Sequence, residues 1–101
     1  MKIEVQGRRL RLDPSLQSLI GRQSAKVRKL LPSFKPHDLD LRVVVEMLPR
    51  GRQCETVLVL MVPQTAIRVR ETANNPATSI THAFHELVRR VQKFKSRLAA
   101  R

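Results

Sequence analysis

Three segments in which polar and apolar residues alternate follow one another in the middle of the sequence, separated only by short turns. The segments are 38–48, 53–62 and 65–71, and the turns are Pro49-Arg50-Gly51 and Pro63-Gln64. A period of two is typical of β-strands with one buried face, and proline and glycine mark the turns between them. The pattern predicts an antiparallel meander. Its second segment, apolar on both faces toward its end, is expected to be an inner strand.

An amphipathic helix is predicted on each side of this meander. Asp13-Pro14 and Asn75-Pro76 each combine a side chain that accepts a backbone N–H with a proline suited to the first helical turn. Pro32 ends the first helix. After each start, apolar residues recur at helical spacing. They are Leu16, Leu19, Ile20, Val27, Leu30 and Leu31 in the first helix, and Ile80, Phe84, Leu87, Val91, Phe94 and Leu98 in the second.

A short strand at 2–7, with Ile3 and Val5 on one side, completes the order β-α-β-β-β-α. Each helix has one apolar stripe to bury, and one sheet face can cover both. The predicted fold class is therefore α+β: a two-layer sandwich with a four-stranded, mostly antiparallel sheet and two helices on one face. The first helix allows the first strand to run parallel to a neighbour. With 101 residues and no linker or repeat, a single domain covering 1–101 is expected.

The net charge of +12, from 20 lysines and arginines against 8 acidic residues, restricts the function more than the fold. Such an excess on a small domain repels itself and indicates a polyanionic partner. The first residues hold no long apolar run, so neither a secretion signal nor a membrane span is expected, and a cytoplasmic protein is predicted. The single cysteine, Cys54, excludes a disulfide framework and fits a reducing compartment.

Basic residues gather on the two predicted helices, where Glu86 is the only acid. Helical spacing forms them into ridges beside the apolar stripes, whereas a solvated helix face normally mixes both signs of charge. These ridges predict phosphate contacts, which strengthen binding through counterion release. We call the predicted RNA-binding residues the basic helix surface: Arg22, Lys26, Arg28, Lys29, Arg89, Arg90, Lys93, Lys95 and Arg97. Secondary RNA contacts are predicted at Arg8, Arg50, Arg52 and His82.

Structured RNA is the polyanion that these residues favour. Aromatic residues make up 3% of the chain, all of them phenylalanine, and Phe84 and Phe94 lie on a buried stripe. Stacking on single-stranded bases is therefore disfavoured. The apolar stripes are needed for the core and leave little to enter a membrane. We expect neither DNA nor a membrane as a partner.

No catalytic or metal site is predicted. His82 and His85 could share one face of the second helix, but no cysteine or carboxylate is clearly placed to complete a metal site. Cys54 has no positioned base and is interpreted as a small apolar strand residue. No glycine-rich phosphate loop is present. The sequence therefore predicts a protein that is not an enzyme and uses no cofactor.

The chain as a whole resembles the ribosome hibernation-promoting factors and ribosome-associated inhibitors, long called sigma-54 modulation proteins. The resemblance rests on coverage of almost the whole chain rather than on one diagnostic motif. The segments that carry it are Ile3-x-Val5-x-Gly7-Arg8, Leu12-Asp13-Pro14-Ser15-Leu16, Lys26-Val27-Arg28-Lys29-Leu30 with Phe34, Asp40-Leu41-Arg42-Val43, Arg70-Glu71 and the closing helix from Ile80 to Lys95.

This resemblance implies a ribosome hibernation factor with the same β-α-β-β-β-α fold. Such a protein would bind rRNA of the small ribosomal subunit where mRNA and tRNAs sit, and would inhibit translation under stress or in stationary phase. The chain is similar to the short form, which helps to pair ribosomes into inactive dimers, and the free protein is expected to be a monomer. Two alternatives stay open: a binder of structured RNA away from the ribosome, and a basic module that docks on an acidic protein.

Overall fold

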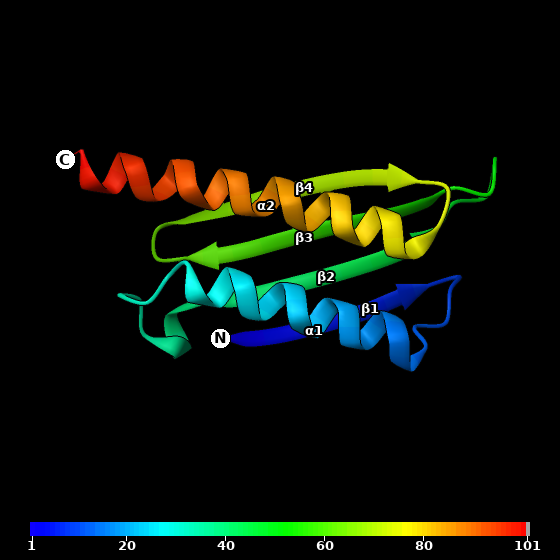
Figure 1. Cartoon of the computed structure of the whole chain (residues 1–101), viewed down its shortest axis with the longest axis horizontal. Coiled ribbons are helices and arrows are strands. Elements are labelled where there is room, and N and C mark those ends of the chain that lie inside the picture. The colour runs from blue at the N-terminus through cyan, green and yellow to red at the C-terminus, as the bar shows by residue number, and fades with distance from the viewer. Residues whose placement is uncertain (101) are drawn as a thin grey trace.

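A four-stranded sheet forms one layer of the molecule, and two helices on one of its faces form the other (Figure 1). The computed structural model describes residues 1–100. Its elements are β1 (Lys2–Arg8), α1 (Pro14–Lys29), a short 3-10 helix (Pro36–Asp38), β2 (Asp40–Met47), β3 (Cys54–Val62), β4 (Thr65–Ala73) and α2 (Pro76–Ala99). The predicted fold class and the predicted order of elements are confirmed.

The strands lie in the sheet in the same order as in the chain, β1-β2-β3-β4. β1 pairs in parallel with β2, because α1 carries the chain back to the end of the sheet where β1 began. The pairs β2–β3 and β3–β4 are antiparallel and are joined by tight turns. As predicted, β3 is an inner strand, and its residues Leu58 and Leu60 are fully buried.

Both helices begin at the capping residues that the sequence indicates. The Asp13 carboxylate accepts a hydrogen bond from the Leu16 N–H at 2.9 Å, and the Asn75 side-chain oxygen accepts one from the Thr78 N–H at 2.9 Å. Each bond satisfies an N–H group that a helix start leaves without a partner. The bond from Leu16 also lowers the pKa of Asp13, so this cap is ionised near neutral pH.

The core lies between the helices and the sheet, where Val27 of α1 and Phe84 of α2 are fully buried. One polar pair is buried with them. The hydroxyl oxygens of Thr56 on β3 and Ser79 on α2 lie 2.8 Å apart. Ser79 donates its hydrogen to the Pro76 carbonyl at 2.9 Å, so Thr56 is the donor within the pair. Because both hydroxyls are satisfied, α2 packs directly on β3 without an unpaired polar group at this contact.

Three features differ from the simplest interpretation of the sequence. β2 begins at Asp40 rather than at residue 38, because Pro36–Asp38 forms the 3-10 helix, and β4 continues to Ala73. Ile3 and Val5 line a groove between β1 and α1, yet they remain 41% and 43% exposed. β1 is an edge strand, and α1 covers its apolar residues only in part.

Candidate nucleic-acid interface

The two helices run in the same direction, so their C-terminal halves lie at the same end of the molecule (Figure 1). α1 contains four lysines and arginines and no acid, whereas α2 contains five and a single acid, Glu86. All of these basic residues lie at or after Arg22 in α1 and at or after Arg89 in α2. The fold therefore gathers the basic helix surface at one end of the helix layer.

On α1, the side chains of Arg22, Lys26 and Lys29 are exposed, and none forms an ion pair within residues 1–100. Arg28 differs from them because it is half-buried and donates to the Leu31 carbonyl at 2.8 Å. The last carbonyls of a helix lack partners within the helix, and basic side chains often supply one. Arg28 thus stabilises the end of α1, and the other three residues are the ones free to contact phosphate.

On α2, the predicted ridge of Arg90, Lys93 and Arg97 lies against β4 and not against α1. These residues line a groove between α2 and β4 whose apolar lining includes Ile67 and Phe94. Lys95 lies on the other flank of the apolar stripe from Lys93, because it follows Lys93 by two residues and is therefore rotated from it by about 200° around the helix. The basic helix surface is therefore divided. One part covers α1 and the adjacent flank of α2, and the other follows the β4 edge.

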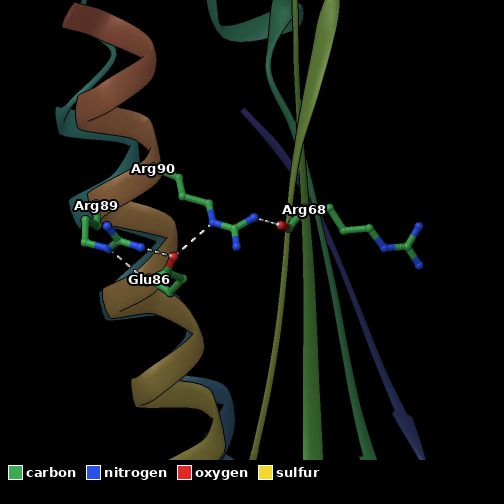
Figure 2. Close-up of polar contacts among 4 residues, drawn as sticks. All are labelled: Arg68, Glu86, Arg89 and Arg90. Carbon is green, nitrogen blue, oxygen red and sulfur yellow. Dashed lines mark hydrogen bonds and ion pairs between the residues drawn. The ribbon is translucent and has the colours of Figure 1, made fainter.

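Glu86 joins two arginines of α2 in one ion-pair network (Figure 2). Its carboxylate accepts hydrogen bonds from Arg89 Nη2 at 2.7 Å and from Arg90 Nε at 3.0 Å. These bonds, the one from Arg89 above all, hold the pKa of Glu86 down to about 2. The carboxyl is therefore ionised at any physiological pH and offsets part of the charge of both arginines.

Arg90 also connects α2 to the edge of the sheet. Its Nη1 donates to the backbone carbonyl of Arg68 at 2.6 Å, whereas the side chain of Arg68 points away from α2 (Figure 2). Arg89 and Arg90 are therefore held in place by the protein itself. Lys93, Lys95 and Arg97 are exposed and form no ion pair within the described part of the chain.

The uncovered face of the sheet carries a more balanced charge than the helix layer. Arg42 Nε lies 3.5 Å from a carboxylate oxygen of Glu4, and Arg70 Nε lies 3.8 Å from one of Glu55. Asp40 and Glu46 line the same shallow hollow as these arginines. Because carboxylates are interleaved with the arginines, this face is less suited to a polyanion than the helix layer.

The predicted secondary contacts lie mostly at the opposite end of the sheet. Arg8 ends β1, and Arg50 and Arg52 are exposed in the turn between β2 and β3. Sequence reasoning missed Arg9 and Arg11, which are exposed in the neighbouring β1–α1 loop. The alternation Arg9-Leu10-Arg11-Leu12 directly after a strand is the signal that could have identified them. His82 is exposed in the second turn of α2.

The structure offers little that resembles a catalytic centre. Within residues 1–100, no three His, Cys, Asp or Glu side chains are grouped so that they could hold a metal ion. Cys54 is buried, and burial raises the pKa of its thiol, which is the opposite of what a reactive thiolate needs. Neither described helix is long and apolar enough to cross a membrane.

Residues 3–99 match the protein family described as Sigma 54 modulation protein / S30EA ribosomal protein. Among solved structures, the N-terminal domain of Protein Y from Thermus thermophilus is similar, with a TM-score of 0.77 and 20% identity over 93% of this chain and 99% of that chain. A ribosomal subunit interface protein from Coxiella burnetii is also similar, with a TM-score of 0.72 and 15% identity over 95% of this chain and 99% of that chain. No curated protein sequence gives a significant match.

Proposed function

Since the chain belongs to the Sigma 54 modulation protein / S30EA ribosomal protein family, we propose that it is a hibernation factor that binds the small ribosomal subunit and blocks translation there. The family consists of non-enzymatic, ribosome-associated inhibitors and subunit interface proteins, which agrees with the prediction that this protein is not an enzyme. Association with ribosomes also implies a location in the cytoplasm.

The observation that carries the proposal is the charge of the helix layer, where α1 and α2 hold nine lysines and arginines against one acid. Exposed like charges on neighbouring helices destabilise a fold unless a partner neutralises them. Phosphates of rRNA would neutralise them, and each contact would release condensed counterions and so favour binding. The partly neutralised sheet face would then be turned away from the rRNA.

The proposed mechanism is occlusion. Arg22, Lys26 and Lys29 on α1, with Lys93 and Arg97 on α2, contact rRNA phosphates, while Arg89 and Arg90 are pre-oriented by Glu86. The folded body of the protein then occupies space that mRNA and tRNA need. No chemical step is required, because bound volume alone prevents these ligands from entering.

Co-sedimentation with purified small ribosomal subunits across a salt series tests this proposal. The triple variant Arg22→Gln, Lys26→Gln, Lys29→Gln should lower the affinity for the subunit. It should also reduce the magnitude of the slope of log K against log salt concentration by about two to three, because each lost phosphate contact removes about one. A matched control is Arg42→Gln, Arg68→Gln, Arg70→Gln, which removes the same charge from the sheet face. Equal losses in the two variants would mean that net charge alone, and not the helix layer, drives binding.

The same preparation separates the two alternatives. Binding to free double-stranded RNA with the same affinity as to subunits would indicate a general structured-RNA binder. Retention on an acidic protein after nuclease treatment, without subunit binding, would indicate a protein-docking module. Gradient sedimentation of the same samples measures whether the protein pairs ribosomes or keeps them apart, and we propose that the free protein is a monomer.

A further inference from the structure

Four arginines lie in the two connections at the end of the molecule away from the basic helix surface. Arg9 and Arg11 lie in the β1–α1 loop, and Arg50 and Arg52 lie in the β2–β3 turn, and we call these four the loop cluster. All four are exposed, and within residues 1–100 none forms an ion pair or a side-chain hydrogen bond. Both connections leave the same end of the sheet, where both helices begin (Figure 1).

Carboxylates near the loop cluster do not neutralise it. Neither α1 nor α2 has an acidic residue in its first turn, so the positive ends of both helices add to the potential there. Within residues 1–100, Asp13, which caps α1, is the one carboxylate that offsets part of the charge of Arg11. Glu46 and Glu55 line the hollow on the open sheet face with Arg8, which is why Arg8 is not counted in the cluster.

Two members of the loop cluster stand where the backbone disfavours any side chain. Arg9 has φ = 56° and Arg52 has φ = 54°, in the left-handed region that glycine occupies without steric penalty. A glycine does occupy the neighbouring position 51, with φ = 75°. Glycine would adopt these backbone angles at 9 and 52 with less strain, so the two arginines are not favoured there by the backbone.

The cluster is also held on a fixed support. Leu10 and Leu12 alternate with the two loop arginines and pack against the core, so Arg9 and Arg11 are turned outward. In the turn, the Leu48 N–H donates to the Gln53 carbonyl at 2.8 Å and closes the four-residue tip that presents Arg50 and Arg52. Guanidinium groups presented in this way lose less conformational entropy on binding a phosphate than groups on a mobile tail.

The loop cluster is electrostatically separate from the basic helix surface. The molecule is 45 Å long, and the start of α1 at Pro14 lies roughly 12 Å along the helix from Arg22, the first member of the basic helix surface on α1. This separation exceeds the Debye length of about 8 Å at physiological ionic strength, so a phosphate at one end hardly senses the charges at the other. Accordingly, we propose that the loop cluster is a second RNA-phosphate site, and that one molecule holds two separate RNA segments, one at each end. This inference rests on the proposed function, which makes the basic helix surface the first RNA site.

The test uses two short RNA hairpins, one with a donor dye and one with an acceptor dye, and the full chain. Energy transfer should rise as protein is added, because one molecule then holds a donor hairpin and an acceptor hairpin. It should fall again when protein is in excess, because each molecule then holds a single hairpin. Arg9→Gly with Arg52→Gly should reduce the transfer about tenfold while binding of a single hairpin persists, and should leave the melting temperature unchanged or higher. Arg11→Gln with Arg50→Gln, which keeps both backbones, should have the same effect on transfer.

Gln64 supplies the matched control, since it has φ = 73° in the turn between β3 and β4, at the other end of the sheet. Gln64→Gly should also leave the melting temperature unchanged or higher, but transfer should persist. Hairpin binding without transfer in the wild-type protein, or transfer that survives both loop variants, would overturn the second site. Absence of hairpin and subunit binding altogether would instead reject the proposed function.

Discussion

The rings of Phe34 and Phe94 lie with their centroids 6.1 Å apart and their planes inclined by 32°, joining the segment after α1 to the C-terminal half of α2. This centroid distance lies within the range of about 4.5–7 Å in which aromatic pairs attract one another. Lys29 precedes one ring by five residues, and Lys93 and Lys95 flank the other. The pair therefore connects the basic residues at the end of α1 with those in the C-terminal half of α2.

Replacing Phe34 by alanine should lower the free energy of unfolding by about 1–2 kcal/mol, less than for a fully buried ring because Phe34 is only half-buried. Chemical denaturation measures this change. Leu98→Ala removes an exposed apolar side chain from the same end of α2 and should change the stability by less than about 0.5 kcal/mol. If the ring pair aligns the helices, Phe34→Ala should also weaken subunit binding, and unchanged binding would show that each helix binds on its own.

Glu86→Gln should remove one acid-sensitive contribution to stability. In the folded protein the pKa of Glu86 is lowered from its usual 4.5 to about 2 by the hydrogen bonds from Arg89 and Arg90. A carboxyl with a depressed pKa stabilises the fold above its unfolded pKa, and this stabilisation is lost as the pH falls through the folded value. The wild-type protein should therefore melt at a higher temperature than the variant above pH 4.5.

The difference in melting temperature should shrink between pH 4.5 and about 2 and then vanish. Asp13 also has a lowered pKa, but it is present in both proteins, so the difference between the two curves isolates Glu86. A difference that does not change with pH would contradict the network seen in Figure 2.

Gly7→Ala should destabilise the protein by about 1–3 kcal/mol through overpacking. A Cβ at position 7 would lie 2.5 Å from the carbonyl oxygen of Leu10, which is backbone and cannot turn aside. Gly21→Ala is the matched control, because a Cβ there meets nothing within 4 Å. In the middle of α1 that change should stabilise the protein by about 0.5–1 kcal/mol. Thermal unfolding measures both changes, and the melting temperature should fall for Gly7→Ala and rise for Gly21→Ala.

Ser79→Ala should cost about 1–3 kcal/mol, because it leaves the buried Thr56 hydroxyl and the Pro76 carbonyl without their partner. Thr56→Val should cost less, about 1 kcal/mol, because Ser79 keeps its hydrogen bond to the Pro76 carbonyl. The two hydroxyls are 2.8 Å apart and belong to residues with no exposed surface. The double variant should be clearly less destabilised than the sum of the single variants, as a double-mutant cycle would measure. Additive losses would indicate that the two hydroxyls do not interact.

The helices and strands were predictable from the spacing of apolar residues and from the capping residues, because both signals depend only on residues within the same segment. Asp13 and Asn75 cap the helices as expected, since a cap depends only on residues a few positions away. The start of β2 was predicted two residues early because Asp38 continues the alternation, while Pro36 favours the 3-10 helix that includes it. A local turn preference here outweighed a weak strand pattern.

The candidate site was less predictable because its geometry depends on neighbours that are distant in sequence. Helical spacing places Arg90, Lys93 and Arg97 in one ridge, but it cannot say whether that ridge meets α1 or β4. Likewise, nothing near Arg90 in the sequence indicates that its guanidinium binds the Arg68 carbonyl, 22 residues away. Backbone angles such as those at Arg9 and Arg52 are equally invisible to residue patterns, because arginine carries no preference for positive φ.

Because the strands lie in the sheet in chain order, two of the three strand pairs join segments that are adjacent in sequence. Isolated hairpins form in about 1–10 μs, whereas β1 can pair only after α1 has been placed across a longer loop. The meander with α2 is therefore expected to nucleate folding, and substitutions in β1 should mainly change the unfolding rate. Of the four strands, β1 is synthesised first, but it can pair only after β2 has been made. Its backbone groups therefore stay unpaired for the longest time during synthesis.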